Sequence, residues 1–286
     1  MKKIKPMMKK KINNYLRIAI QILFFLLMPS VFTTAFSGAK YIFTKIGNEQ
    51  AIAMTPFVTV LVVLCAYTIV FGRFFCGFAC AFGSVGDWIH EIYIFICKKA
   101  KKKPVTISEK IRKKLSYLKY IILTAIVLAC FFGVYSKTKG WSPWDVFSML
   151  ISGNISFAAY VPAIIILLLI IIGMAVCERF FCRFLCPMGA VFSILPMLPI
   201  FSFTRDRENC IKGCRACTNK CPADIELPKL GTDIQSGDCF MCQKCINVCP
   251  KKNVRTLGIS KLRGDEVAFT LIKVIILIIV MKIAGV

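Results

Sequence analysis

Long apolar runs constrain this chain more than any other feature of its sequence. A helix needs about 20 mostly apolar residues to cross the hydrocarbon core of a bilayer. Five stretches reach or approach that length, at about 15–36, 51–72, 115–136, 157–177 and 266–283. Charged residues make up only 18% of the chain, against about a quarter in an ordinary soluble domain. We therefore expect an all-α polytopic membrane domain that contacts the lipid bilayer.

The basic residues predict how this domain is oriented. Residues 1–14 hold six lysines and residues 98–114 hold nine Lys or Arg, each block beside an apolar run. Lys and Arg collect on the cytoplasmic side of short loops. The N-terminus and the basic loop should therefore be cytoplasmic, in the cell membrane of a prokaryote. This placement accounts for the net charge of +24 without nucleic-acid binding. The first run has no cleavage pattern after it and should remain as an anchor.

An internal duplication divides the membrane part. Residues 72–85 (GRFFCGFACAFGSV) and 178–191 (ERFFCRFLCPMGAV) share eight identities in fourteen positions at a constant offset of 106. This pattern predicts two duplicated helical hairpins of the same sense, related by an axis along the membrane normal. Two shorter apolar stretches, 84–97 and 188–203, follow the motifs and are expected to be re-entrant or interfacial helices.

The expected organisation of the chain has six parts. They are a basic cytoplasmic N-terminus (1–14), a first membrane repeat (15–97), a basic cytoplasmic loop (98–114), a second membrane repeat (115–203), a cysteine-rich module (204–264) and a C-terminal transmembrane helix (265–286). The module should face the cytoplasm with the two basic segments.

The cysteine-rich module carries the strongest chemical signal. Its second motif, from Cys239 to Pro250, reads C-x2-C-x2-C-x3-C-P, which wraps three corners of an iron–sulfur cubane and sends the fourth cysteine to a neighbouring cluster. Its first motif, from Cys210 to Pro222, has a first gap of three residues, which Gly213 could absorb in a tight turn. Zinc prefers two separated cysteine pairs and fits less well.

The cross-ligation rule assigns the eight cysteines to two [4Fe–4S] clusters. One cluster would be held by Cys210, Cys214, Cys217 and Cys249, and the other by Cys221, Cys239, Cys242 and Cys245. The polar segment around them resembles a bacterial two-cluster ferredoxin with a shortened linker at 223–238, which implies a small α+β fold.

Four further cysteines lie in the repeats as two C-x3-C motifs. These are Cys76, Cys80, Cys182 and Cys186. The i, i+4 spacing puts each pair on one helix face, and the two pairs could form one more metal or cluster site. A thiol–disulfide relay, a transient copper site and simple packing stay open as alternatives. Arg73 and Arg179 precede the motifs and would either snorkel to headgroups or lower the pKa of the thiols.

Other cofactors find little support in the sequence. His90 is the single histidine, so this chain cannot supply a bis-histidine haem by itself. No glycine-rich strand–turn–helix motif indicates flavin or nucleotide binding. Asp87, His90 and Glu91 are a weak candidate for a quinone or proton site, or else the solvated edge of an interfacial helix.

The paired C-x3-C motifs and the two ferredoxin motifs together resemble the NapH-type membrane ferredoxins and the C-terminal membrane half of NosR-type regulators. The resemblance implies electron transfer between the quinone pool and a redox partner protein, by a subunit rather than by an enzyme acting alone. Ala81 stands where the family pattern has proline, and the apolar tail is additional. A copper-handling assembly factor (RdxA/CcoG-like) and a redox-sensing regulator are the alternatives.

Overall fold

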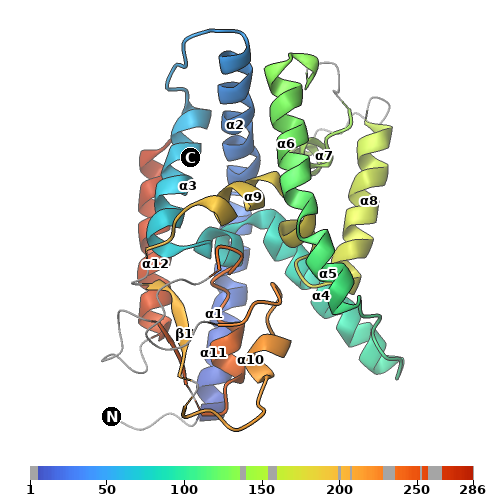
Figure 1. Ribbon diagram of the computed structural model, residues 1–286, viewed down its shortest axis with the longest axis vertical. Coiled ribbons are helices and arrows are strands. Elements are labelled where there is room, and N and C mark those ends of the chain that lie inside the picture. The colour runs from blue at the N-terminus through green and yellow to red at the C-terminus, as the bar shows by residue number, and fades with distance from the viewer. Residues whose placement is uncertain are drawn as a thin grey trace.

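The computed structural model is mostly helical and has two parts. It describes residues 6–135, 140–153, 160–198, 201–206, 208–227, 236–251, 253–256 and 266–285. Long apolar helices form one part, and a small module with β1, α10 and α11 lies at one end of them (Figure 1). The expected module linker falls largely on residues 228–235, which lie outside the described ranges.

The apolar part contains ten helices among the described residues. They are α1 (Pro6–Leu27), α2 (Val31–Gly47), α3 (Pro56–Phe71), α4 (Ala81–Lys99), α5 (Glu109–Leu115), α6 (Leu118–Phe131), α7 (Pro143–Ser152), α8 (Val161–Val176), α9 (Pro187–Ile194) and α12 (Glu266–Ile283). Helices α3, α7, α8 and α9 have proline in their first two positions, as α1 does with Pro6. The fixed φ of proline suits a helix start, and its missing N–H costs nothing there.

The first predicted span, 15–36, is not one straight helix. It breaks between α1 and α2, whose axes differ by 60°. Pro29 lies in the break, and proline disfavours helical backbone at the residue before it. The sequence pattern located the apolar residues but not this bend.

Few helices are long enough to cross a bilayer unaided. Among the described residues, the α5–α6 unit over Glu109–Phe131 qualifies by length and composition, and the bent α1–α2 pair would be a second if it counts as one broken span. The apolar helices α3 and α8 have 16 residues each, about 24 Å at the usual rise. The five-span architecture therefore stays a prediction.

The duplicated motifs fold alike. In each repeat an apolar helix ends, a π-helical turn follows, and a second helix starts. The turns are η1 (Phe75–Ala79) between α3 and α4, and η3 (Phe181–Leu185) between α8 and α9. Cys80 and Cys186 leave these turns with extended backbone and become the N-cap residues of α4 and α9. The expectation that each C-x3-C pair shares one α-helix face is therefore wrong.

The module is a small α+β unit. Strand β1 (Phe203–Arg205) pairs antiparallel with β2 (Val254–Thr256), with Phe203 opposite Thr256. Two short helices, α10 (Ala216–Asn219) and α11 (Lys244–Val248), follow cysteines of the first and second motif. The expectation of a helical chain that carries a small ferredoxin-type module is confirmed.

Candidate metal centres

The structure brings the four repeat cysteines together. Cys76, Cys80, Cys182 and Cys186 are all buried. Cys182 interacts electrostatically with Cys76, and Cys186 interacts with the other three. We call these four thiols the repeat centre. It joins two segments that lie 106 residues apart in the chain.

Two of these thiols sit at helix N-termini. The Gly189 amide donates a hydrogen bond to Cys186 Sγ (3.1 Å) at the start of α9. The Gly83 amide bonds to the Cys80 sulfur in the same way at the start of α4. Backbone N–H donors and the positive end of a helix dipole stabilise a thiolate. Both positions therefore suit metal-bound sulfur.

A pair of arginines crosses between the repeats. Arg73, from the first repeat, donates to the carbonyl of Cys182 (Nη2–O 3.4 Å). Arg179, from the second repeat, donates to the carbonyls of Cys76 and Gly77. Both side chains are buried beside the thiols, so the snorkelling interpretation is wrong. Each guanidinium therefore hydrogen-bonds to the backbone of the cysteine turn in the opposite repeat.

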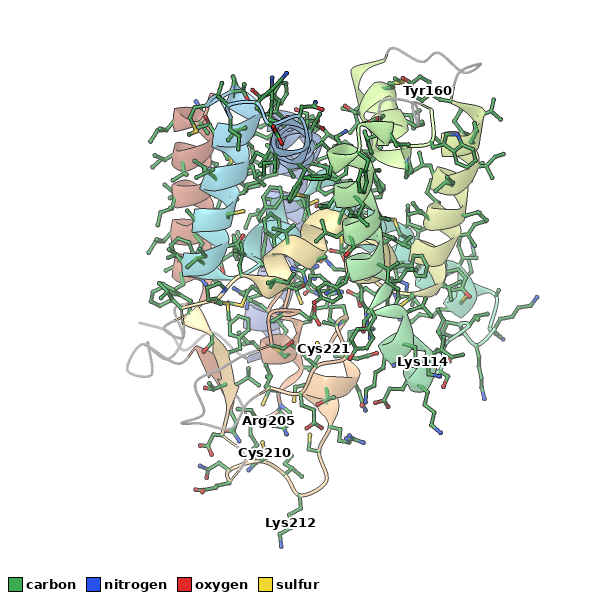
Figure 2. The ribbon with its side chains drawn as sticks, turned by 45° about the horizontal axis from the view of Figure 1, so that its top comes forward. Lys114, Tyr160, Arg205, Cys210, Lys212 and Cys221 are labelled. Atoms are coloured by element: carbon green, nitrogen blue, oxygen red, sulfur yellow. The ribbon has the colours of Figure 1, made fainter. Side chains whose placement is uncertain are left out.

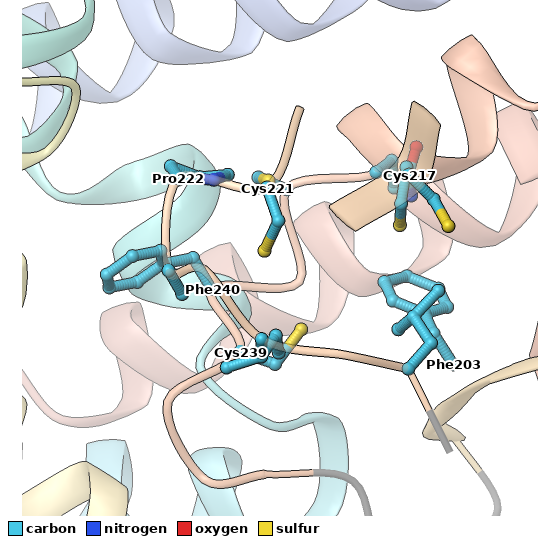
Figure 3. Close-up of a pocket in the computed structure, with 12 residues that line it drawn as sticks. Phe203, Cys217, Cys221, Pro222, Cys239 and Phe240 are labelled. Atoms are coloured by element: carbon cyan, nitrogen blue, oxygen red, sulfur yellow. The ribbon is translucent and has the colours of Figure 1, made fainter. Parts of the chain in front are cut away.

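A second group of cysteines lies directly beyond the repeat centre, in the module. It consists of Cys221, Cys239, Cys242 and Cys245, which we call the proximal group. These four line one cavity together with Cys217, Phe203 and Phe240 (Figure 3), and Cys245 interacts electrostatically with the other three cysteines of the proximal group. They are the four cysteines that the cross-ligation rule assigned to one cluster. Burial raises the pKa of the Cys221 thiol to about 11, and metal binding would displace that proton.

The remaining four module cysteines, Cys210, Cys214, Cys217 and Cys249, form the distal group. Arg205 Nη1 donates to Cys217 Sγ (3.2 Å) and also interacts with Cys210. The Asn253 amide donates to Cys249 Sγ (3.2 Å), while its side-chain Nδ2 lies 3.9 Å from Cys210 Sγ. Cys210 lies farther from the helices than Cys221 does (Figure 2). The three groups therefore follow one another from the helices to the tip of the module.

The proximal group touches the repeat centre. A methyl group on Gly77, between Cys76 and Cys80, would come within 2.2 Å of the Phe240 carbonyl oxygen. The guanidinium carbons of Arg73 and Arg179 lie 4.7 and 5.4 Å from the centre of the Phe240 ring. Arg179 interacts electrostatically with cysteines of both groups, Cys182 and Cys242. The turn at Gly77 and the two arginines therefore contact the backbone and ring of Phe240, which lies between Cys239 and Cys242 of the proximal group.

Buried positive charge is in excess around this contact. Three carboxylates are each shared by two cations: Asp87 by Arg17 and Arg179, Asp238 by Lys119 and Arg73, and Asp224 by Arg112 and Arg183. Five of these six cations are buried, whereas Arg112 is partly exposed, so five buried cations against three carboxylates leave two buried positive charges uncompensated. Buried unpaired charge is costly. Anionic thiolate-ligated clusters in the repeat centre and the proximal group would balance it.

The donor set in each group fits an iron–sulfur cluster. The candidate ligands in each group are all thiols, and backbone amide or guanidinium donors face Cys186, Cys217 and Cys249. In the described part of the chain, no three His, Cys, Asp or Glu side chains are spaced for one metal ion. Cluster thiolates bind different iron atoms, so they stand farther apart than the ligands of a single ion.

The weak quinone candidates do not form one site. Asp87 is 3% exposed and is held by Arg17 and Arg179. His90 Nδ1 contacts the Ala175 carbonyl (2.8 Å), and Glu91 is exposed. The sequence interpretation missed Arg17 and Lys119. Both are charged residues inside predicted apolar spans, a recognised signal for a functional site.

Comparison with known proteins identifies the two cysteine repeats. The family described as "4Fe-4S binding domain" matches residues 53–104 and 161–199, the two cysteine repeats. An uncharacterised protein of Methanocaldococcus jannaschii is 34% identical over 63% of this chain and 62% of its own length.

Two named relatives are more distant. The methylamine utilization ferredoxin-type protein MauN of Paracoccus denitrificans is 27% identical over 66% of this chain and 63% of its own. The ferredoxin-type protein NapH of Escherichia coli is 24% identical over 69% and 65%. The chain spans less than two thirds of the length of each of these three relatives. No solved structure matches it. On these matches, and on the paired cysteine repeats that they cover, the chain is a 4Fe-4S ferredoxin-type protein that resembles the NapH-type membrane proteins.

Proposed function

We propose that this protein conducts electrons along three iron–sulfur centres, at the repeat centre, the proximal group and the distal group. They would link the quinone pool of the membrane to a redox partner protein. The observation that carries the proposal is the contact at Gly77, where the backbone of the proximal group lies against the turn of the repeat centre. When bound, such clusters accept and release one electron at a time.

The surrounding residues would hold the centres in place and set their electrostatic environment. The twelve thiols supply the ligands. Arg73 and Arg179 keep positive charge beside the repeat centre and the proximal group, which favours an added electron. Phe240 is buried beside the proximal group, and a polar cavity lined by Arg73, Lys119 and Asp238 also borders it. Three thiols of the distal group are partly exposed, and Cys210 lies farther from the helices than Cys221 does (Figure 2), so the distal group is the end that a partner protein can approach.

Apolar outward faces support insertion in a bilayer. Large apolar side chains are exposed on α8 and α12, among them Leu168, Leu169, Ile172, Ile275 and Ile279. Contiguous exposed apolar surface indicates a membrane or protein contact. With the basic loop at 98–114 on the cytoplasmic side, the module would be cytoplasmic and the repeat centre would lie near the inner membrane surface.

Metal counting on the anaerobically purified protein tests the three-centre proposal. The unaltered chain should hold about twelve iron atoms and the Cys76→Ser/Cys182→Ser variant about eight, if each centre is a four-iron cluster. The matched control is Cys65→Ser/Cys130→Ser, which removes two cysteines outside the three groups and should leave the count unchanged. A count of eight in every protein would overturn the repeat centre as a cluster. Copper lost only from the first variant would favour metal handling instead, since thiolates suit copper(I).

A further inference from the structure

The tip of the module combines an exposed redox centre with an unusual surface. Cys210 and Cys214 of the distal group are partly exposed, whereas all four thiols of the repeat centre are buried. Lys212 marks the end of the molecule farthest from the apolar helices (Figure 2). An electron that enters or leaves at this tip must pass to a molecule that touches it.

The side chains at the tip are an apolar centre with a basic rim. Ile211, next to Cys210, is 49% exposed. Exposed basic residues surround the distal cysteines, namely Lys212, Arg215, Lys220 and Lys251. This surface resembles a small protein-binding patch, in which an apolar centre lies inside a polar rim. Here Ile211 is the apolar centre and the cations form the rim.

Acidic residues at the tip are fewer. Glu208, two residues before Cys210, is exposed. Glu226 lies 3.5 Å from Arg215, and Glu109 of α5 also interacts with Arg215, so these two acids offset part of its charge. The rim is therefore positive overall. Its field would attract a negatively charged protein and repel a positively charged one.

We propose that this tip is the docking site of an acidic, one-electron carrier protein, such as a small ferredoxin with a negative surface around its own cluster. The proposal rests on the proposed function, because it assumes that electrons cross the distal group. In each encounter the carrier loses one electron and the distal centre gains it, or the reverse, and no bond or proton is exchanged. The small patch and its charge suit a transient complex, which binds weakly and forms quickly.

The position of the patch argues against an anionic membrane surface as the occupant. The tip points away from the apolar helices (Figure 2), whereas a lipid-binding basic segment lies beside its membrane span. The basic end of α4, at Lys98 and Lys99, is the segment in that second position. It supplies a matched control with the same type of charge.

The test compares three variants with the intact protein in detergent, under anaerobic conditions. Lys212→Gln/Arg215→Gln/Lys220→Gln removes three rim charges, Lys98→Gln/Lys99→Gln/Lys102→Gln removes three elsewhere, and Glu208→Gln removes the acid at the tip. The probes are an acidic plant-type ferredoxin and, as the opposite charge, a basic cytochrome c. The measurements are the dissociation constant of each oxidised probe and its electron-transfer rate constant, at low and high salt.

We expect the rim variant to bind the ferredoxin at least tenfold more weakly at low salt, with a correspondingly lower rate constant. The control variant should match the intact protein, and raising the salt should remove the difference. Glu208→Gln should bind the ferredoxin more tightly, a gain that damage to the fold could not produce. Reduction by dithionite, followed by EPR, should be the same in all four proteins.

Equal weakening by the rim and control variants, or tighter binding of cytochrome c than of ferredoxin, would overturn the docking proposal. Rim-dependent binding of a vesicle with anionic lipids but not of ferredoxin would overturn it in favour of a membrane contact. If dithionite reduces no cluster in the intact protein, the proposed function itself fails, which is a different result from a loss of docking alone.

Discussion

The two cysteine repeats are alike where they face each other and different where they face the module. In both, the amide of the second cysteine donates to the carbonyl five residues earlier: Cys80 to Phe75 and Cys186 to Phe181, at 2.9 Å each. In both, the arginine before the motif crosses to the other repeat. The shared features are those that build the repeat centre.

The first difference concerns the partner of each arginine. Arg179 is paired with Asp87 of the first repeat (2.5 Å). The position equivalent to Asp87 in the second repeat is Ser193, which hydrogen-bonds Arg73 Nη1 (3.0 Å) but carries no charge. The carboxylate near Arg73 is Asp238, 3.7 Å away and supplied by the module. One arginine is therefore paired with a carboxylate of the repeats and the other with a carboxylate of the module.

The second difference concerns the residue after the first cysteine of each motif. In the first repeat it is Gly77, whose missing side chain lets the Phe240 backbone approach. In the second repeat it is Arg183, which donates to the Pro222 carbonyl (3.2 Å) and pairs with Asp224. The two repeats thus contact the module next to the proximal group in different ways. One provides space for it, and the other provides a charged contact.

Removing Asp87, the acid within the repeats, should have the largest effect on stability. Asp87→Asn leaves Arg17 and Arg179 buried without a carboxylate, and breaking a buried ion pair in this way costs about 3–5 kcal/mol. We expect a large fall in thermal stability in detergent, together with loss of iron from the repeat centre. Glu91→Gln, an exposed change on the same helix, should alter stability by about 0.5 kcal/mol or less. Equal effects of the two changes would contradict the assigned role of Asp87.

Filling the space at Gly77 should have an intermediate effect on stability. Gly77→Ala puts a methyl group against backbone that cannot move like a side chain, at a cost of about 1–3 kcal/mol. We expect the EPR signal of the proximal group to change while the iron of the distal group is retained. Gly86→Ala is the control, because its methyl group would meet the flexible Met174 side chain at 3.3 Å. An unchanged proximal signal in Gly77→Ala would show that the close contact is not needed.

Much of this comparison could be predicted from the sequence. The constant offset of 106 identified the duplication. The cysteine spacing predicts a division of the module thiols in which Cys221, Cys239, Cys242 and Cys245 belong together, and these four line one cavity that Cys217 also lines. Periodicity alone did not predict the π-helical turns, because an i, i+4 cysteine pair reads as an α-helix face. The turns instead put Cys80 and Cys186 at the starts of new helices.

The sequence could not pair the charges. Arg17, Asp87 and Arg179 are separated by 70 and 92 residues, so only the packing of the helices shows that they meet. The motif alignment could have indicated the replacement of Asp87 by Ser193, but not that Asp238 would supply the missing carboxylate. That contact depends on how the module docks, which local sequence patterns do not record.

Removing Asp238, and then placing an acid at Ser193 instead, should have the smallest effect on stability of the three changes. Asp238 is 37% exposed, so water screens its loss, and we expect Asp238→Asn to cost about 1–2 kcal/mol. The loss should appear mainly as faster amide exchange and proteolysis of residues 236–251, because this carboxylate bridges the module to Lys119 and Arg73. Adding Ser193→Asp would give the second repeat the internal acid of the first. The double variant should regain stability while the module stays loosely attached. If it instead restores protection of residues 236–251, charge neutralisation alone holds the module, and the two repeats do not differ in the way proposed.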